Sequence, residues 1–99
     1  MNEVNQIVLD CMAKALRINQ TTNADLLFNF SGHVNAISCY GYRNGYNNSP
    51  KDEDGYPIPD FEPIDVLVLL DSENAVSNLH SLQESLNTCL LYTSPSPRD

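Results

Sequence analysis

The residues of this chain that could do chemistry are few, and their spacing matches no catalytic arrangement. Ser31 and His33 stand two positions apart in a Ser-Gly-His sequence. A serine nucleophile needs a base that a third group orients, yet no acidic residue has an evident place beside His33, and no Gly-x-Ser-x-Gly elbow surrounds Ser31. We interpret the segment as a polar turn and expect no catalytic residue in it.

The acidic segment Asp52–Gly55 invites comparison with a calcium-binding loop, but the comparison fails. If Gly55 is the invariant glycine of the EF-hand pattern, Pro50 and Phe61 occupy the first and last ligand positions. We therefore interpret the segment as a solvated acidic loop. Weak, unselective cation binding is left open as an alternative. Its carboxylates would be those of Asp52, Asp54, Asp60 and Glu62.

Other signatures of a metal or cofactor are missing from the sequence. His33 and His80 have no zinc-ligand spacing relative to Cys11 or Cys39, and neither glycine-rich phosphate-binding motif occurs. We expect no metal and no cofactor, and an enzyme is the less favoured class.

Tyr40–Tyr46 is the stretch most typical of a recognition surface. It combines tyrosines with glycine, asparagine and one arginine, which supply rigid aromatic contacts and adaptable hydrogen bonds. Core packing at the end of a strand is the alternative, and we favour it over a contact patch. The candidate contact residues are His33, Tyr40, Tyr42, Arg43, Tyr46, Tyr56 and Phe61.

Two helices are predicted to position these residues. Apolar residues spaced three and four apart indicate a first helix of about four turns; they are Val4, Ile7, Val8, Cys11, Met12, Ala15 and Leu16. Residues 19–23 are predicted to be a polar connection. The second helix is predicted after residue 70, with Asp71 or Ser72 as its N-cap and Glu73 in its first turn. Its apolar stripe is Val76, Leu79, Leu82 and Leu86.

Between the helices, alternating apolar and polar residues predict a β-hairpin over residues 24–42. On its first strand, one face carries Ala24, Leu26, Phe28 and Phe30. Gly32 lies in the predicted turn, where a tight reversal favours positive φ. Residues 43–63 show no apolar period and are expected to be a structureless loop, either functional or disordered. Residues 64–70 are strongly apolar and are expected to form a central strand.

This order of elements, α-β-β-β-α, indicates one α+β domain: a three-stranded antiparallel sheet with both helices packed on one face. Double-stranded-RNA-binding domains have the same order, and they bind through basic residues at the start of the second helix. Here residues 71–74 read Asp-Ser-Glu-Asn, so the predicted start of the second helix is acidic where those domains are basic.

The net charge of −8 bears on the partners to expect. The basic residues before position 89 are Lys14, Arg17, Arg43 and Lys51. Because phosphate contacts from Lys and Arg dominate nucleic-acid affinity, we expect no nucleic-acid partner, whereas a protein with a basic surface is allowed. No apolar run reaches membrane-spanning length, so we expect no membrane partner. Cys11 and Cys39 lie in apolar patterns typical of buried free cysteines. Glu3 and Asp10 interrupt any secretory signal at the N-terminus. We therefore expect a reduced, cytoplasmic location.

Phe28–Asn35 reads Phe-Asn-Phe-Ser-Gly-His-Val-Asn and lies between a helix and a Tyr- and Gly-rich strand. This hairpin resembles that of small uncharacterised phage and prophage proteins of Firmicutes, α-β-β-β-α chains with an F-x-F-S-G-H-V hairpin. The resemblance spans about residues 12–88 and rests on that one hairpin. Residues 43–63 depart from the family's shorter Gly- and Trp-bearing segment, and this chain has no Trp. The resemblance implies a phage or mobile-element accessory protein and supplies no catalytic residue.

Residues 89–99 have the sequence Cys-Leu-Leu-Tyr-Thr-Ser-Pro-Ser-Pro-Arg-Asp. This string resembles one translated frame of the transposase end and adaptor of a sequencing library. We therefore expect residues 1–88 to be the single natural domain and residues 89–99 to be a non-native tail. Whether the natural chain extends beyond residue 88 is left open.

Two function classes remain open on these grounds. The favoured class is a small, acidic, non-enzymatic accessory or protein-binding protein of phage or mobile-element type. The alternative is a subunit of an enzyme whose site is completed by oligomerisation or by a partner. The sequence leaves the oligomeric state open.

Overall fold

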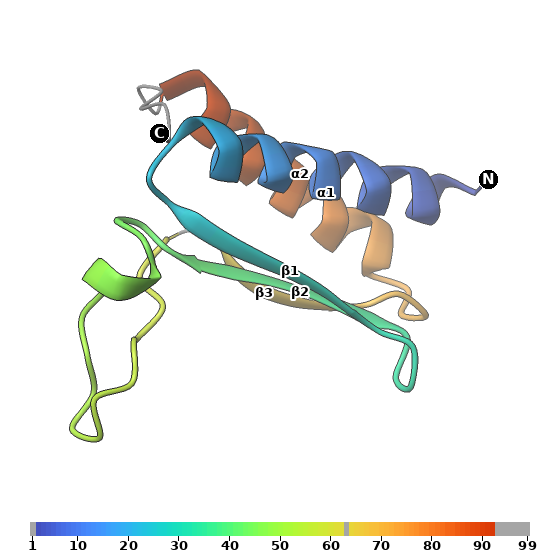
Figure 1. Ribbon diagram of the computed structural model, residues 1–99. Coiled ribbons are helices and arrows are strands. Elements are labelled where there is room, and N and C mark those ends of the chain that lie inside the picture. The colour runs from blue at the N-terminus through green and yellow to red at the C-terminus, as the bar shows by residue number, and fades with distance from the viewer. Residues whose placement is uncertain (1, 63, 93–99) are drawn as a thin grey trace.

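The computed structural model describes residues 2–62 and 64–92, and it confirms the α-β-β-β-α order. Its elements are α1 (Glu3–Thr21), β1 (Asp25–Ser31), β2 (Ala36–Tyr42), the 3-10 turn η1 (Tyr46–Asn48), β3 (Asp65–Leu69) and α2 (Ala75–Tyr92). The strands form an antiparallel sheet in the order β1-β2-β3. Both helices lie on one face of this sheet (Figure 1).

Helix α1 is longer than its apolar pattern predicted, because its last turn is held by polar contacts. The Asn2 side chain caps its start by accepting a hydrogen bond from the Asn5 N–H at 2.8 Å. At the other end, the Asn19 amide accepts from the Leu26 N–H at 2.7 Å and donates to the Leu26 carbonyl at 2.8 Å. The prediction of a polar connection over residues 19–23 is therefore wrong for residues 19–21, which are helical.

The buried face of α1 is narrower than the sequence pattern. Ile7, Cys11 and Ala15 are buried as predicted, and Ile18 joins them. Met12 and Leu16, which we placed on the same stripe, are 43% and 56% exposed. Because one helical turn takes 3.6 residues, apolar residues spaced four apart drift steadily around the helix. Met12 and Leu16 therefore lie too far around α1 to reach α2 or the sheet.

The β1–β2 hairpin has the predicted faces, with a shifted turn. Phe28 pairs with Cys39 and Phe30 with Ile37, so both phenylalanines share the face that the helices cover. Phe28 packs against the core, but Phe30 is 59% exposed because it lies near the far end of the hairpin. The turn has its positive φ at Asn35 (50°) rather than at Gly32, which agrees with the tolerance of asparagine for this region.

We expect Phe28→Ala to lower the free energy of unfolding by about 2 kcal/mol, because it removes a half-buried ring from the core. Phe30→Ala is the matched control on the same strand face, and its cost should stay below about 0.5 kcal/mol. Urea denaturation followed by circular dichroism measures both values. A larger loss for Phe30 than for Phe28 would mean that the helices cover the other end of the hairpin.

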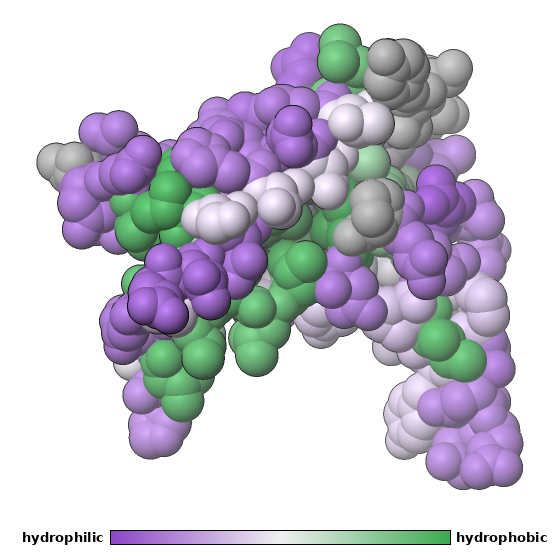
Figure 2. All heavy atoms as spheres, turned by 180° about the vertical axis from the view of Figure 1, so that it is seen from behind, coloured by the Kyte–Doolittle hydropathy of each residue, from purple (hydrophilic) through white to green (hydrophobic). Residues whose placement is uncertain are grey.

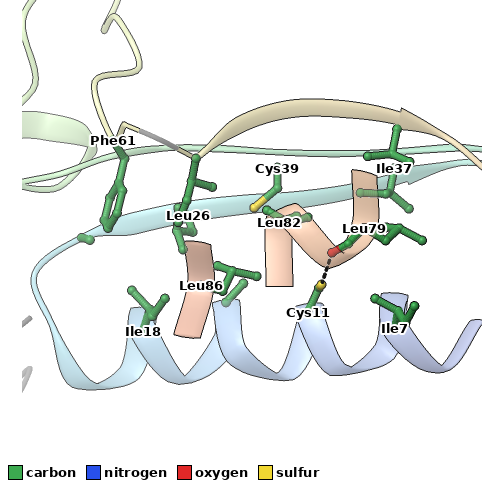
Figure 3. Close-up of a cluster of buried hydrophobic side chains, with 14 of the residues drawn as sticks. Ile7, Cys11, Ile18, Leu26, Ile37, Cys39, Phe61, Leu79, Leu82 and Leu86 are labelled. Carbon is green, nitrogen blue, oxygen red and sulfur yellow. Dashed lines mark hydrogen bonds between the residues drawn. The ribbon is translucent and has the colours of Figure 1, made fainter. Parts of the chain in front are cut away.

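The core lies between the sheet and the two helices (Figure 3). Ile37 and Cys39 of β2 and Val68 of β3 face it from the sheet. Leu79, Leu82 and Leu86 of α2 are buried to 1% exposure or less. The Cys11 thiol is 3.9 Å from the Leu79 carbonyl oxygen. Burial raises the pKa of Cys11 to about 11 and that of Cys39 to about 12, so both remain unreactive thiols at neutral pH.

Helix α2 starts later than predicted. Residues 70–74 form turns, in which the Ser72 N–H and hydroxyl both donate to the Leu69 carbonyl, at 3.1 and 2.9 Å. The N-cap prediction of Asp71 or Ser72 is therefore wrong, and the helix begins at Ala75 without an acidic residue in its first turn. The Asp71 carboxylate instead accepts a hydrogen bond from the Asn35 side chain across the end of the sheet.

The end of α2 bears on the predicted tail at residues 89–99. The helix runs through residue 88 to Tyr92, and Cys89 and Leu90 pack half-buried against the core. Residues 93–99 lie outside the described residues. The non-native origin of the tail stays a prediction, and its first residues extend the helix rather than hanging free.

The segment between β2 and β3 has a defined structure, contrary to the expectation of a structureless loop. It holds η1 and an antiparallel bridge between Lys51 and Pro57. The N–H groups of Asp60 and Phe61 both donate to the Gly41 carbonyl, at 2.9 and 3.1 Å. We call residues 46–60 the arm, because they project away from the sheet as a narrow finger (Figure 1).

Candidate functional site

The end of β2 brings together four of the candidate contact residues. The rings of Tyr42 and Tyr46 meet edge to face, with centroids 5.1 Å apart and planes 82° apart. The Arg43 guanidinium carbon lies 5.0 Å from the centroid of the Phe61 ring. Tyr42 and Phe61 are only 6% and 4% exposed, so they act mainly in packing. Burial raises the pKa of the Tyr42 phenol.

Arg43 is held within the chain at the base of the arm. Its backbone N–H donates to the Asp60 carboxylate at 2.8 Å, and its guanidinium donates to the Glu62 carbonyl at 2.8 Å. Together with the stacking on Phe61, these contacts fix the angle at which the arm leaves the sheet. Arg43 and Asp60 thus have a structural role here, whichever ligand the protein binds.

The other three candidate residues are not part of this cluster. His33 is exposed in the turn between β1 and β2, at the opposite end of the sheet from the arm. Tyr56 is 67% exposed near the tip of the arm. Tyr40 is half-buried on the sheet face that the helices leave uncovered. The structure therefore gathers four of the seven residues in a packed cluster, leaves Tyr40 beside it on the same strand face as Tyr42, and places His33 and Tyr56 apart.

That uncovered face, which we call the outer face, carries apolar residues that were not among the predicted contact residues. Strand pairing places Leu27, Tyr40 and Asp65 in one row. The next rows are Asn29, Ser38 and Leu67, then Ser31, Ala36 and Leu69. Leu67 is 67% exposed and Leu69 is 50% exposed.

The position of β3 in the sheet explains this exposure. We predicted a central strand for residues 64–70, but β3 is an edge strand and β2 is central. Only Val66 and Val68 face the helices, while Leu67 and Leu69 point outward. The only sequence signal that the two faces of this strand differ is Asp65, which shares a face with Leu67 and Leu69. The apolar character of the rest of the run hid that signal.

The arm presents its acidic residues in a preformed turn. The Asp52 carboxylate accepts hydrogen bonds from the N–H groups of Asp54, at 3.0 Å, and Tyr56, at 2.9 Å. The Asp52 N–H donates to the Tyr56 carbonyl at 2.9 Å. The Lys51 ammonium is turned back onto the Asn47 and Ser49 carbonyls, at 3.3 and 2.7 Å. The tip therefore displays carboxylates while its one lysine is used internally.

The arm and its base carry a net negative charge. Residues 43–62 contain five acidic and two basic side chains, a net charge of −3. In the described part of the chain, no group of three or more His, Cys, Asp or Glu side chains converges to hold a metal ion. The carboxylates are spread along the arm and its base, which suits long-range attraction of a basic surface more than chelation.

A shallow, open hollow lies along α2 and offers no chemistry of its own. Among the described residues, its lining comes from Ser81, Glu84, Ser85, Thr88 and Cys89. Burial raises the pKa of the Cys89 thiol, although the positive charge of Arg43 opposes the rise. A protonated thiol beside serine hydroxyls that donate to their own helix is not a nucleophile with a base.

None of the helices within the described ranges is long and apolar enough to cross a membrane. Comparison of the chain with protein-family models, with curated proteins and with solved structures finds no match.

Proposed function

We propose that this chain is a small, acidic, non-enzymatic protein-binding domain, and that it engages a partner with a basic surface through the outer face and the arm. The observation that carries the proposal is the exposure of Leu67 and Leu69 on the outer face, on the same strand as Asp65, which lies at the end of β3 nearer the acidic arm. Exposed apolar patches with a charged rim are typical of protein interaction sites.

The shape of this side supports the proposal. Viewed with β3 nearest, hydrophobic side chains gather beneath the sheet in a hollow between two projecting ends of the molecule (Figure 2). One end is the arm, and the other is the β1–β2 turn. A partner segment seated in this hollow would cover Leu67 and Leu69 while its basic residues faced the carboxylates of the arm.

The charge distribution favours a protein over a nucleic acid as the partner. Arg43 and Lys51, the basic residues nearest the outer face, are both engaged within the chain. Phosphate contacts from several free Lys or Arg side chains would be needed for nucleic-acid affinity. We propose an accessory role in a phage or mobile element, which rests on the resemblance of residues 28–35 alone.

The test is affinity capture from a nuclease-treated Firmicutes lysate, with wild type, Leu67→Asp and Ser81→Asp as baits. We expect a basic protein to be enriched on wild type and to be reduced at least about tenfold on Leu67→Asp, because a buried carboxylate opposes docking. Ser81→Asp adds the same charge to the exposed face of α2 and should retain the protein.

Salt provides a second criterion for the same experiment. Because the attraction is between a basic partner and the arm, capture should weaken as salt rises from 0.05 to about 0.5 M. Equal retention of the captured protein by wild type and Leu67→Asp would contradict the role of the outer face. A parallel capture from an untreated lysate completes the test: a protein captured there but not after nuclease treatment would point to a nucleic-acid partner and overturn the proposal.

A further inference from the structure

Helix α1 carries a second apolar stripe on the side away from the core. Leu9, Met12 and Leu16 are 49%, 43% and 56% exposed. Their spacing of three and four residues places them on one line along the helix. We call these three residues the α1 stripe.

The surroundings of the α1 stripe are almost free of charge, which is unusual in so acidic a chain. The exposed residues of α1 beside it are Asn5, Gln6, Ala13, Arg17 and Gln20. Asp10 and Lys14 lie on the other side of the helix, where they form an ion pair and Asp10 also accepts from Gln83 of α2 at 2.6 Å. These two contacts lower the pKa of the Asp10 carboxyl.

Helix α2 shows what an ordinary exposed helix face looks like in the same protein. Between Ala75 and Thr88 its exposed positions include Ser77, Asn78, His80, Ser81 and Glu84, and none of these is apolar; only in its last turn is an apolar residue, Leu91, exposed. The two helices have similar lengths and pack on the same sheet face. An exposed apolar stripe of this length is therefore specific to α1, and it suggests that another surface packs against it.

We propose that the α1 stripe is the contact surface of a homodimer, in which two copies of α1 pack antiparallel about a two-fold axis. Charge selects this occupant. A second copy carries the same −8, so its approach is least opposed through a face without net negative charge. The α1 stripe is such a face, and α1 lies on the helical side of the sheet whereas the arm projects away from that side (Figure 1).

The sequence of α1 is self-complementary about a point between residues 12 and 13. An axis there places Leu9 opposite Leu16 of the partner subunit, and Asn5 opposite Gln20 of the partner subunit. It also brings the two copies of Met12 together, and the two copies of Ala13, where the small side chain allows close approach. Such an isologous contact repeats each favourable pair twice, and the antiparallel arrangement also opposes the two helix dipoles.

The dimer should be weak because the contact is small. A 19-residue helix is about 28 Å long, and one helix pair buries less than the roughly 1,200 Å² of a stable complex. We expect a Kd of roughly 10 to 100 µM. Because both copies are acidic, added salt should strengthen the dimer by screening their repulsion, whereas it should weaken the proposed capture of a basic partner.

Sedimentation velocity of the full chain between about 5 µM and 1 mM tests the proposal. We expect the mass to rise toward twice the 11.0 kDa of one chain. Leu9→Glu should weaken the association at least about tenfold, and circular dichroism should show an unchanged fold, since Leu9 is half exposed. Ser81→Glu is the matched control on α2 and should behave as wild type.

Oxidative cross-linking tests the orientation independently, in a Cys89→Ser background. Ala13→Cys should form a covalent dimer, since the two copies of residue 13 meet near the axis. Asn5→Cys should not, because the antiparallel axis separates its two copies by about 22 Å along the helices, far beyond disulfide reach. A monomeric wild type at 1 mM, or association unchanged by Leu9→Glu, would overturn the proposal. Cross-linking of Asn5→Cys but not of Ala13→Cys would overturn the antiparallel arrangement.

Discussion

Gly41→Ala should be among the most damaging single-methyl changes in this protein, with a loss of about 3 kcal/mol in the free energy of unfolding. A Cβ atom at Gly41 would lie 2.7 Å from the Asp25 carbonyl oxygen and 2.6 Å from Cδ2 of Leu26. The first of these atoms belongs to the backbone of the paired strand, so rotation of a side chain cannot relieve the contact. The strands β1 and β2 would have to separate.

The expected loss is large relative to the total stability, which is about 5 to 15 kcal/mol for a typical domain. Separation of the strands would also disturb the Gly41 carbonyl, which accepts from the N–H groups of Asp60 and Phe61 and holds the base of the arm. Urea denaturation of wild type and variant measures the effect. The cooperativity of the transition should be retained even where the midpoint falls.

Gly32→Ala is the matched control for this prediction. A Cβ atom there has its nearest neighbour, a Phe30 ring carbon, at 3.6 Å, which is an ordinary contact. Its free energy of unfolding should stay within about 0.5 kcal/mol of wild type. If Gly41→Ala and Gly32→Ala had equal midpoints, the two strands would have to be further apart at Gly41 than the structure places them.

Phe61→Ala should cost about 3 to 5 kcal/mol, and it should also release the arm. Phe61 is 4% exposed and belongs to the core, although it lies outside every helix and strand. It fastens the end of the arm to the sheet and supports the Arg43 guanidinium. Its loss therefore removes a core ring and one of the contacts that fix the direction of the arm.

Two measurements separate these effects. Urea denaturation reports the loss of stability, and limited proteolysis under native conditions reports cleavage within residues 46–60. Tyr56→Ala is the control, since Tyr56 is 67% exposed. Its free energy of unfolding should stay within about 0.5 kcal/mol of wild type, and its rate of proteolysis within about twofold. Unchanged proteolysis of Phe61→Ala would show that the backbone hydrogen bonds to Gly41 hold the arm without the ring.

The order and type of the elements could be predicted because each long element had a clear period. The three- and four-residue spacing of the helices and the alternation over residues 24–31 reflect local geometry that tertiary contacts did not override. The position of β3 could not be predicted in this way. Residues 64–70 are as apolar as a central strand, and only the pairing with β2 shows that Leu67 and Leu69 are left outside.

The candidate site was harder to predict than the fold, because the type of a residue does not say whether its side chain points into the core or toward solvent. For the aromatic and arginine residues near the end of β2 we favoured core packing over a contact patch; Tyr42 and Phe61 are indeed buried, and Arg43 is held by the Glu62 carbonyl. The structure of the arm depends on backbone contacts such as those to Gly41, which have no pattern in the sequence. Apolar residues that looked like core, Met12 and Leu16 among them, form exposed surface instead.

The hydrogen bonds between Asn19 and Leu26 have a consequence for aggregation. The Asn19 amide satisfies both the N–H and the carbonyl that Leu26 turns away from β2, much as one residue of a neighbouring strand would. Unpaired strand edges recruit strands from other molecules and can seed fibrils. In this protein the Asn19 side chain therefore closes the β1 edge at Leu26, so a strand from another molecule could pair with this edge only beyond that residue.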